Sequence, residues 1–235
     1  MKLSTLDNLL SEKERKLPCV LVTRLGDGHQ VLWSEYANLS KTEFPEILAD
    51  ACRDALLKDK GCQFELADER YFLQVHNPPK RLLIVGAVHI SQFLAPMAVM
   101  SGYGVTLIDP RGAWATQERF PGIPLDKRWP DEALADLAPD ARTAIVTLTH
   151  DPKLDDPALE FALRSECFYL GALGSRKTHG KRVERLAAIG FGEADTRRIA
   201  APVGLDIGAI SPAEIAVSIL AEMTLSLHGP RRKTI

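Results

Sequence analysis

The chain has 235 residues, of which 46% are hydrophobic and 26% are charged, as in a soluble globular protein with a sizeable core. The formal net charge of -2 predicts no basic field that would attract nucleic acid or a membrane surface. No apolar run approaches the roughly 20 residues that span a bilayer, and the N-terminus lacks a signal-peptide core. We therefore expect a cytoplasmic protein in which anions bind only at local clusters of charge.

Residues 1–77 carry the parts of a small α/β domain. The expected elements are a helix over 3–16, a hairpin joined by Asp27-Gly28, a helix over 41–60 and short strands over 62–66 and 70–75. Pro78-Pro79 continues neither a helix nor a ladder, so we place a domain boundary near residue 78. Four cysteines, Cys19, Cys52, Cys62 and Cys167, form no CxxC pair, which argues against zinc and predicts buried thiols.

A different pattern of expected secondary structure begins at residue 78 and continues to residue 235. Buried strands over 81–87, 104–109, 141–151 and 167–175 alternate with helices, including helices over 89–101 and from about 157 to 164. This alternation predicts a Rossmann-like parallel sheet with helices on both faces. The last helix has a capping signal in Ser211, Pro212 and Glu214.

The turn after the first of these strands resembles a damaged dinucleotide fingerprint. Gly86 matches the first glycine of G-x-G-x-x-G, but Val88 and Ser91 replace the second and third. Asp109, at the end of the next strand, suits a ribose hydroxyl, whereas a valine occupies space that a pyrophosphate needs. We therefore expect a Rossmann fold but disfavour NAD(P) as its ligand. His89, at the helix entrance, is either a ligand contact or an ordinary polar residue.

Ligands of open parallel sheets bind beyond the carboxyl ends of the strands, and four strand ends converge there in this interpretation. In "THDPKLDD", His150 and Asp151 suit a general base, a proton shuttle or a metal ligand, although Asp-Pro dipeptides are also ordinary helix entries. Gly204, Asp206 and Gly208 either line the same site or form a tight connector.

The stretch "GALGSRKTHGKR" predicts an anion site. Gly174 keeps the backbone free of a Cβ, Ser175 caps a helix from about Arg176, and Arg176 with Lys177 adds charge beside free amides, which suits a phosphate. We expect Val183, Leu186 and Ile189 to face inward. His179, Lys181, Arg182 and Arg185 are predicted to form the solvated face of this helix.

Four motifs occur together: "LLIVGAVHISQFLAPMAVMSGYGVTLIDPR", "VTLTHDPKLDD", "YLGALGSRKT" and "PVGLDIGAISPAEIAVSILAE". In this order they resemble the C-terminal Rossmann domain of the XdhC/CoxI family, over about residues 80 to 229. Members of that family are accessory proteins of molybdenum hydroxylases. The resemblance implies binding of molybdenum cofactor, its sulfuration with a cysteine desulfurase and its delivery to a client such as xanthine dehydrogenase. Because that cofactor ends in a phosphate, the resemblance gives Gly174 to Lys177 a candidate ligand.

The chain departs from the family pattern at two places. Gly86-Ala87-Val88-His89 stands where relatives usually have "GAGH", and residues 1–77 contain neither a "GSAPR"-like stretch nor a "GGCVE"-like cysteine motif. The preferred hypothesis is a non-catalytic cofactor chaperone, for which no catalytic residue, metal ligand or sulfur-transfer thiol is nominated. The alternatives are an NAD(P)-linked oxidoreductase and a degenerate scaffold member. A homodimer is expected only from the general frequency of dimers.

Overall fold

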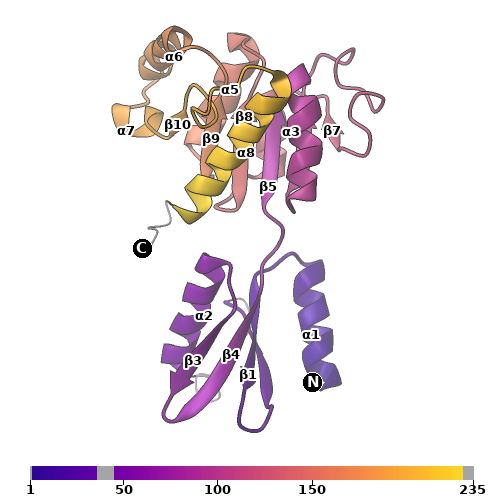
Figure 1. Cartoon of the computed structure of the whole chain (residues 1–235), viewed down its shortest axis with the longest axis vertical. Coiled ribbons are helices and arrows are strands. Elements are labelled where there is room, and N and C mark those ends of the chain that lie inside the picture. Colours follow the sequence, from indigo (N-terminus) through magenta and orange to yellow (C-terminus); the bar gives the residue numbers. More distant parts are fainter. Residues whose placement is uncertain (1, 36–44, 230–235) are drawn as a thin grey trace. The chain divides into compact units, whose positions relative to one another are not determined.

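The computed structural model describes residues 2–35 and 45–229. The chain divides into two compact units, Met1–Pro78 and Pro79–Ile235, which are described separately (Figure 1). Among the described residues, no helix combines the length and the apolar character that crossing a bilayer requires.

The first unit is an antiparallel sheet with a helix on each face. Its strands run in the order β2-β1-β4-β3. Alternation along β1 sends Cys19 and Leu21 toward Leu9 of α1, and Val20 and Val22 toward the α2 side. The elements are α1 (Leu3–Glu14), β1 (Cys19–Arg24), β2 (Gln30–Trp33), α2 (Glu46–Lys58), β3 (Cys62–Leu66) and β4 (Glu69–His76). The predicted hairpin at Asp27-Gly28 is confirmed by the β1–β2 pairing.

Two details of this unit differ from the prediction. The second helix begins at Glu46 and not at 41, and residues 41–44 of that prediction lie outside the described residues. Cys19, Cys52 and Cys167 are buried as predicted, but Cys62 is exposed. Cys62 begins β3, which lies at an edge of the sheet and has a mostly exposed side-chain pattern.

The second unit is built on a six-stranded parallel sheet in the order β10-β9-β8-β5-β6-β7, which confirms the predicted fold class. From β5 the chain proceeds to β6 on one side and later returns to β8 on the other, so the strand order reverses between β5 and β8. The strands are β5 (Arg81–Val85), β6 (Gly104–Ile108), β7 (Leu125–Asp126), β8 (Thr143–Thr147), β9 (Tyr169–Ala172) and β10 (Ile199–Ala200).

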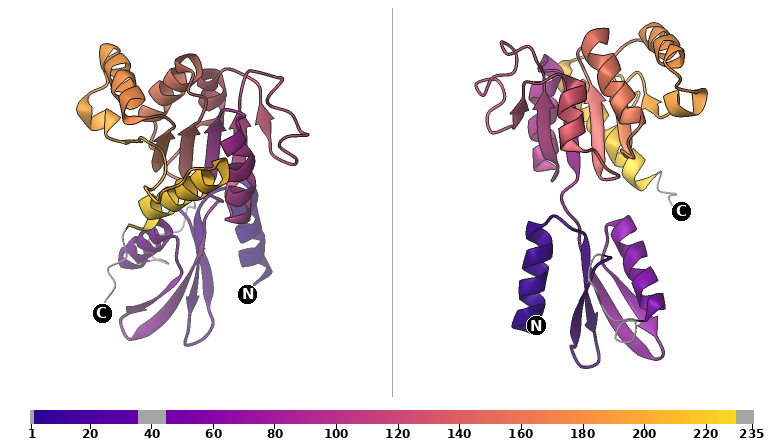
Figure 2. Two further views of the ribbon diagram at one scale, coloured as in Figure 1. Left: turned by 45° about the horizontal axis from the view of Figure 1, so that its top comes forward. Right: turned by 180° about the vertical axis from the view of Figure 1, so that it is seen from behind.

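Helices cover both faces of this sheet, as Figures 1 and 2 show. On one face, Leu82 and Ile84 of β5 share a core with Leu94 and Ile219 from two helices. On the other face, Leu83 and Val85 of β5 share a core with Leu134, Leu159 and Leu186. The helices are α3 (His89–Met100), α4 (Pro130–Leu137), α5 (Pro152–Leu163), α6 (Arg176–Ala188), α7 (Glu193–Thr196) and α8 (Pro212–His228).

The helix starts show which local signals were sufficient. The α8 signal is confirmed, because the Ser211 hydroxyl accepts the Glu214 N–H and the Glu214 carboxylate accepts the Ser211 N–H at 2.8 Å. The α5 start is corrected from about 157 to Pro152, since Asp151 caps the helix there by accepting the Lys153 N–H at 3.0 Å. The sequence prediction omitted α4, α7 and the short strands β7 and β10.

Candidate functional site: the loops at one edge of the parallel sheet

The neighbouring strands β6, β5, β8 and β9 are parallel, so their carboxyl ends lie at one edge of the sheet. We call the residues that follow them, 86–89, 109–112, 149–153 and 173–178, the loop edge. The loop edge contains nearly all of the predicted ligand residues: Gly86, His89, Asp109, His150, Asp151, Gly174, Ser175, Arg176 and Lys177. The reversal between β5 and β8 places this edge where open α/β sheets bind ligands.

Gly86 brings two of these loops into contact. Its φ is +118°, and a Cβ added there would lie 2.7 Å from Cγ2 and 3.3 Å from the backbone nitrogen of Thr149. Only glycine satisfies both the dihedral angle and the close approach. The loops on the two sides of the strand reversal therefore touch at their bases.

Asp109 is fully buried and saturated by protein donors. Its carboxylate accepts the Ala87 N–H at 2.7 Å, and it accepts three bonds from the backbone and guanidinium of Arg111. Burial is the largest single influence and raises the pKa of Asp109, but the bonds from Arg111 and Ala87 together lower the pKa below its ordinary value. A carboxylate has about four acceptor positions, so the predicted ribose contact lacks a free one.

Two arginines of this region were not among the predicted residues. Arg111 lies two positions after Asp109, within the quoted "DPR". This short spacing in the sequence could have predicted the contact between the two side chains. Arg119 donates to the Ala87 carbonyl at 2.9 Å and lies 5.4 Å from the ring centre of Trp114, which is half exposed. Nothing local links Arg119 to Ala87. Together with Asp109, Arg119 holds the backbone of the first loop from both its N–H and its carbonyl.

The start of α6 has the predicted features of an anion site. Ser175 caps the helix by accepting the Thr178 N–H at 3.2 Å, and Gly174 has φ +140° with Thr178 carbons 3.2 Å from its would-be Cβ. The main-chain N–H groups of Arg176 and Lys177 have no hydrogen-bond partner among the described residues, and both side chains are exposed. Free amides at a helix start beside two cations fit a terminal phosphate.

The loop after β8 divides into an exposed tip and a buried base. His150 is exposed and has φ +62°, while the Asp151 side chain is occupied as the cap of α5. Asp155 is 1% exposed and accepts the Thr149 hydroxyl at 2.6 Å. Burial raises the pKa of Asp155, and the Thr149 hydrogen bond and the Arg182 charge only partly oppose this shift. His150 is thus the freer of the two predicted residues.

The expected orientation of α6 is wrong at two positions. Arg182 was assigned to the solvated face, but it is 2% exposed and donates to the Leu173 carbonyl at 2.9 Å. Arg182 lies four residues before buried Leu186 and therefore on the same helix face, which was an available signal. Ile189, expected to face inward, is 52% exposed because it is the C-cap residue and lies beyond the last full turn.

The segment after β10 is held close to the sheet, but its aspartate is not. The Gly204 N–H donates to the Glu222 carboxylate at 2.8 Å, and the Tyr169 hydroxyl donates to the same oxygen. Gly204 has φ +93°, and a Cβ there would lie 2.2 Å from the Ser218 hydroxyl. The predicted residue Asp206 is exposed, and no described contact of its side chain joins it to the loop edge.

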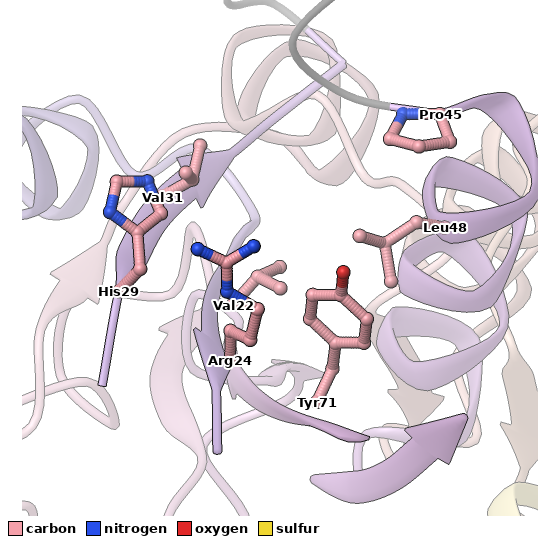
Figure 3. Close-up of a pocket in the computed structure, with 7 residues that line it drawn as sticks. All are labelled: Val22, Arg24, His29, Val31, Pro45, Leu48 and Tyr71. Atoms are coloured by element: carbon pink, nitrogen blue, oxygen red, sulfur yellow. The ribbon is translucent and has the colours of Figure 1, made fainter. Parts of the chain in front are cut away.

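Within residues 2–35 and 45–229, no three histidine, cysteine, aspartate or glutamate side chains are grouped so as to hold a metal ion. The first unit contains a hollow of about 210 Å³ between its sheet and α2, lined by Arg24, His29 and Tyr71 with apolar neighbours (Figure 3). Arg24 is bound there to Asp27, with Nε 3.0 Å from Oδ1. None of the residues that line this hollow was predicted to bind a ligand, because the predicted ligand residues all belong to the second unit.

Comparison with known proteins places this unit in a family. The XdhC Rossmann domain family matches residues 82–223. The Escherichia coli protein called molybdenum cofactor insertion chaperone PaoD is 33% identical over 152 residues, which are 64% of this chain and 42% of that protein. A Bacillus subtilis protein, named as a probable xanthine dehydrogenase subunit, is 33% identical over 153 residues, or 65% of this chain and 44% of that one. The chain spans less than half the length of these curated relatives.

A solved structure supports the fold over both units. It is a Bacillus halodurans protein described as a xanthine dehydrogenase, and the similarity has a TM-score of 0.69 at 21% identity. It covers 99% of this chain and 65% of that chain. The family match extends over more than half of the chain and includes the strands and helices that form the loop edge. The protein therefore belongs to the XdhC family through its Rossmann domain.

Proposed function

We propose that this protein binds molybdenum cofactor at the loop edge and delivers it to a molybdenum hydroxylase of the xanthine dehydrogenase kind. The observation that carries the proposal is the start of α6, where Arg176 and Lys177 offer two cations and two amides that bond to none of the described residues. The cofactor is a pterin with a terminal phosphate, so its phosphate end matches this site. The names of the Escherichia coli and Bacillus subtilis relatives support the same ligand and client class.

The described residues suit a carrier that grips the phosphate end. The bound cofactor would supply the metal centre on which the client enzyme depends, while this chain binds and orients the group. Arg176 and Lys177 neutralise the phosphate charge, and Gly174 allows the backbone to approach it. Roles for a cysteine desulfurase and a homodimer stay predictions from the sequence.

The test is an anaerobic titration of the purified protein with molybdenum cofactor, followed by reconstitution of an apo-hydroxylase. Arg176→Ala/Lys177→Ala removes two charge-assisted contacts, each contributing about 1.5 kcal/mol, so we expect roughly 100-fold weaker binding. Lys181→Ala/Arg197→Ala removes the same charge from exposed positions away from the α6 start and serves as the control. Equal binding by all three proteins, or no binding by the wild type, would overturn the proposal.

NADH and NADPH serve as comparison ligands in the same titration. Val88 begins the turn into α3, buried Ser91 donates to the Gly86 carbonyl, and Asp109 is already saturated. We therefore expect no binding of either dinucleotide at millimolar concentration. Measurable binding would favour the oxidoreductase alternative.

A further inference from the structure

Arg182 is the largest fully buried side chain in the described part of the chain. Its guanidinium lies beneath the loop between β9 and α6, where Nη2 donates to the Leu173 carbonyl at 2.9 Å. Leu173 directly precedes Gly174, so this bond fixes the first residue of the proposed phosphate loop. A surface lysine or arginine would make no such contact with the loop base.

Asp155, in the first turn of α5, faces the same guanidinium. Asp155 Oδ2 lies 3.7 Å from Arg182 Nη2, and both side chains are 2% exposed. Asp155 Oδ1 accepts the Thr149 hydroxyl at 2.6 Å. The contacts form one buried path from Thr149 through Asp155 and Arg182 to the Leu173 carbonyl. The path joins the loop after β8 to the loop after β9.

The two charges depend on each other. Asp155 Oδ2, Arg182 Nε and Arg182 Nη1 have no hydrogen-bond partner among the described residues. Each is therefore compensated mainly by the opposite charge. Neutralising one side chain leaves the other charge buried without compensation, and replacing the guanidinium with an ammonium changes how the two groups meet.

We propose that Asp155 and Arg182 are positioning residues that couple the loop after β8 to the phosphate loop after β9, so that the two loops adopt one geometry together. The coupling rests on the proposed function only for the identity of the ligand. Energetic coupling is reciprocal, so ordering of either loop must order the other. A measurement that changes one helix and reads out the loop of the other tests this coupling directly.

A second ion pair between the same helices provides a matched control. Arg185 Nη2 donates to Asp156 Oδ1 at 2.9 Å. Asp156 directly follows Asp155 on α5, and Arg185 lies about one turn after Arg182 on α6. The Arg185 side chain is 41% exposed, and no described bond of this pair reaches either loop. Asp156→Asn and Arg185→Lys thus change an α5–α6 ion pair and remove none of the hydrogen bonds of the buried path.

The experiment is amide hydrogen exchange of the full chain without ligand, in wild type and single variants. Asp155→Asn, a change on α5, is expected to raise exchange at 173–178 by about fivefold or more. Arg182→Lys, a change on α6, is expected to raise exchange at 149–151 by a similar factor. The control variants at 156 and 185 should leave both segments within about twofold of wild type, and strand β5 should stay unchanged in every protein.

Thr149→Val tests the path without altering a buried charge. The valine keeps the Cγ2 methyl group beside Gly86 and removes the hydroxyl, which donates to Asp155 and also accepts the Asp151 N–H at 3.1 Å. Because the second bond lies within the loop after β8, only exchange at 173–178 reports on the path. Faster exchange at 173–178 in this variant supports the proposal. The proposal is overturned if each variant loosens only the loop of its own element, or if exchange rises uniformly across residues 79–229.

The result is independent of cofactor titration. If a variant raises exchange in the loop of the other element and the protein does not bind cofactor, the coupling is supported and the proposed function is rejected. If the protein binds cofactor and no variant raises exchange in the other loop, the proposed function is supported and the coupling is rejected.

Discussion

Single residues at the loop edge act mainly by holding backbone. Asp109 accepts bonds from Ala87 and Arg111, and the net effect is a pKa below its ordinary value. A carboxyl whose pKa is lowered in the folded state contributes stability above its unfolded pKa, and this contribution is lost as pH falls through the folded pKa. The protein should therefore lose part of its stability in the acid range through this one group.

Replacing Asp109 with asparagine tests the direction of this pH dependence. The variant loses charge-assisted acceptors, so we expect about 2 kcal/mol lower stability at pH 7. Below about pH 4 the difference from wild type should begin to shrink, because the Asp109 carboxylate then takes up a proton in the unfolded state while it stays ionised in the folded state. Urea unfolding between pH 3 and pH 7 measures both values. A difference that stays constant across this range would contradict the assignment.

Two glycines give a matched prediction about close packing. A Cβ at Gly171 would lie 2.5 Å from Cγ2 of Val203, whereas a Cβ at Gly180 of α6 meets nothing within 4 Å. We expect Gly171→Ala to destabilise the protein by about 1–3 kcal/mol through overpacking. Gly180→Ala should stabilise it by about 0.5–1 kcal/mol, because alanine favours a helix interior. Thermal or urea unfolding of the two variants should move in opposite directions.

At the scale of elements, capping signals located the start of α8 but not the start of α5. The start of α8 was predictable because serine, proline and glutamate occupy three nearby capping positions. The start of α5 was misplaced because Pro152 and Pro157 are both plausible first positions, and the Asp151 cap selects the first. The two-residue strands β7 and β10 are too short to show any hydrophobic period.

The capping box of α8 has a measurable contribution. Ser211→Ala removes the acceptor of the Glu214 N–H, so we expect a loss of about 1 kcal/mol and faster amide exchange in the first turn of α8. Ser211→Asp restores an acceptor at the same position and should recover most of the loss. Equal stability of the alanine and aspartate variants would show that the cap is not the cause.

At the scale of the molecule, the sequence predicted the layers and the position of the loop edge better than the contacts behind it. Alternating strands and helices predict a parallel sheet, and the carboxyl ends of parallel strands lie at the same edge of the sheet. The bond from Arg119 to Ala87 joins residues 32 positions apart, and the Arg182 contact needs the packing of α6 on α5. Helical spacing could place Arg182 on the inner face of α6, but the residues that it contacts on other elements carry no local signal in a single sequence.

The division into two units predicts separate stabilities. Leu73 is fully buried in the core of the first unit, so Leu73→Ala should destabilise that unit by about 2–5 kcal/mol. Amide exchange should rise in residues 2–35 and 45–78, while strands β5 and β8 keep their protection. Equal loss of protection in both units would show that they unfold as one and would reject the proposed boundary near residue 78.

The loops of the candidate site are held from behind by polar side chains. Buried Asp109 holds the first loop, buried Asp155 and Arg182 hold the next two, and half-buried Glu222 holds the segment near Gly204. This separation makes the domain a practical scaffold for directed evolution. A library randomised at exposed His89, His150, Arg176 and Lys177 would sample new ligand specificities on a preserved fold. A library that also varied the polar side chains behind the loops would consist largely of unfolded variants.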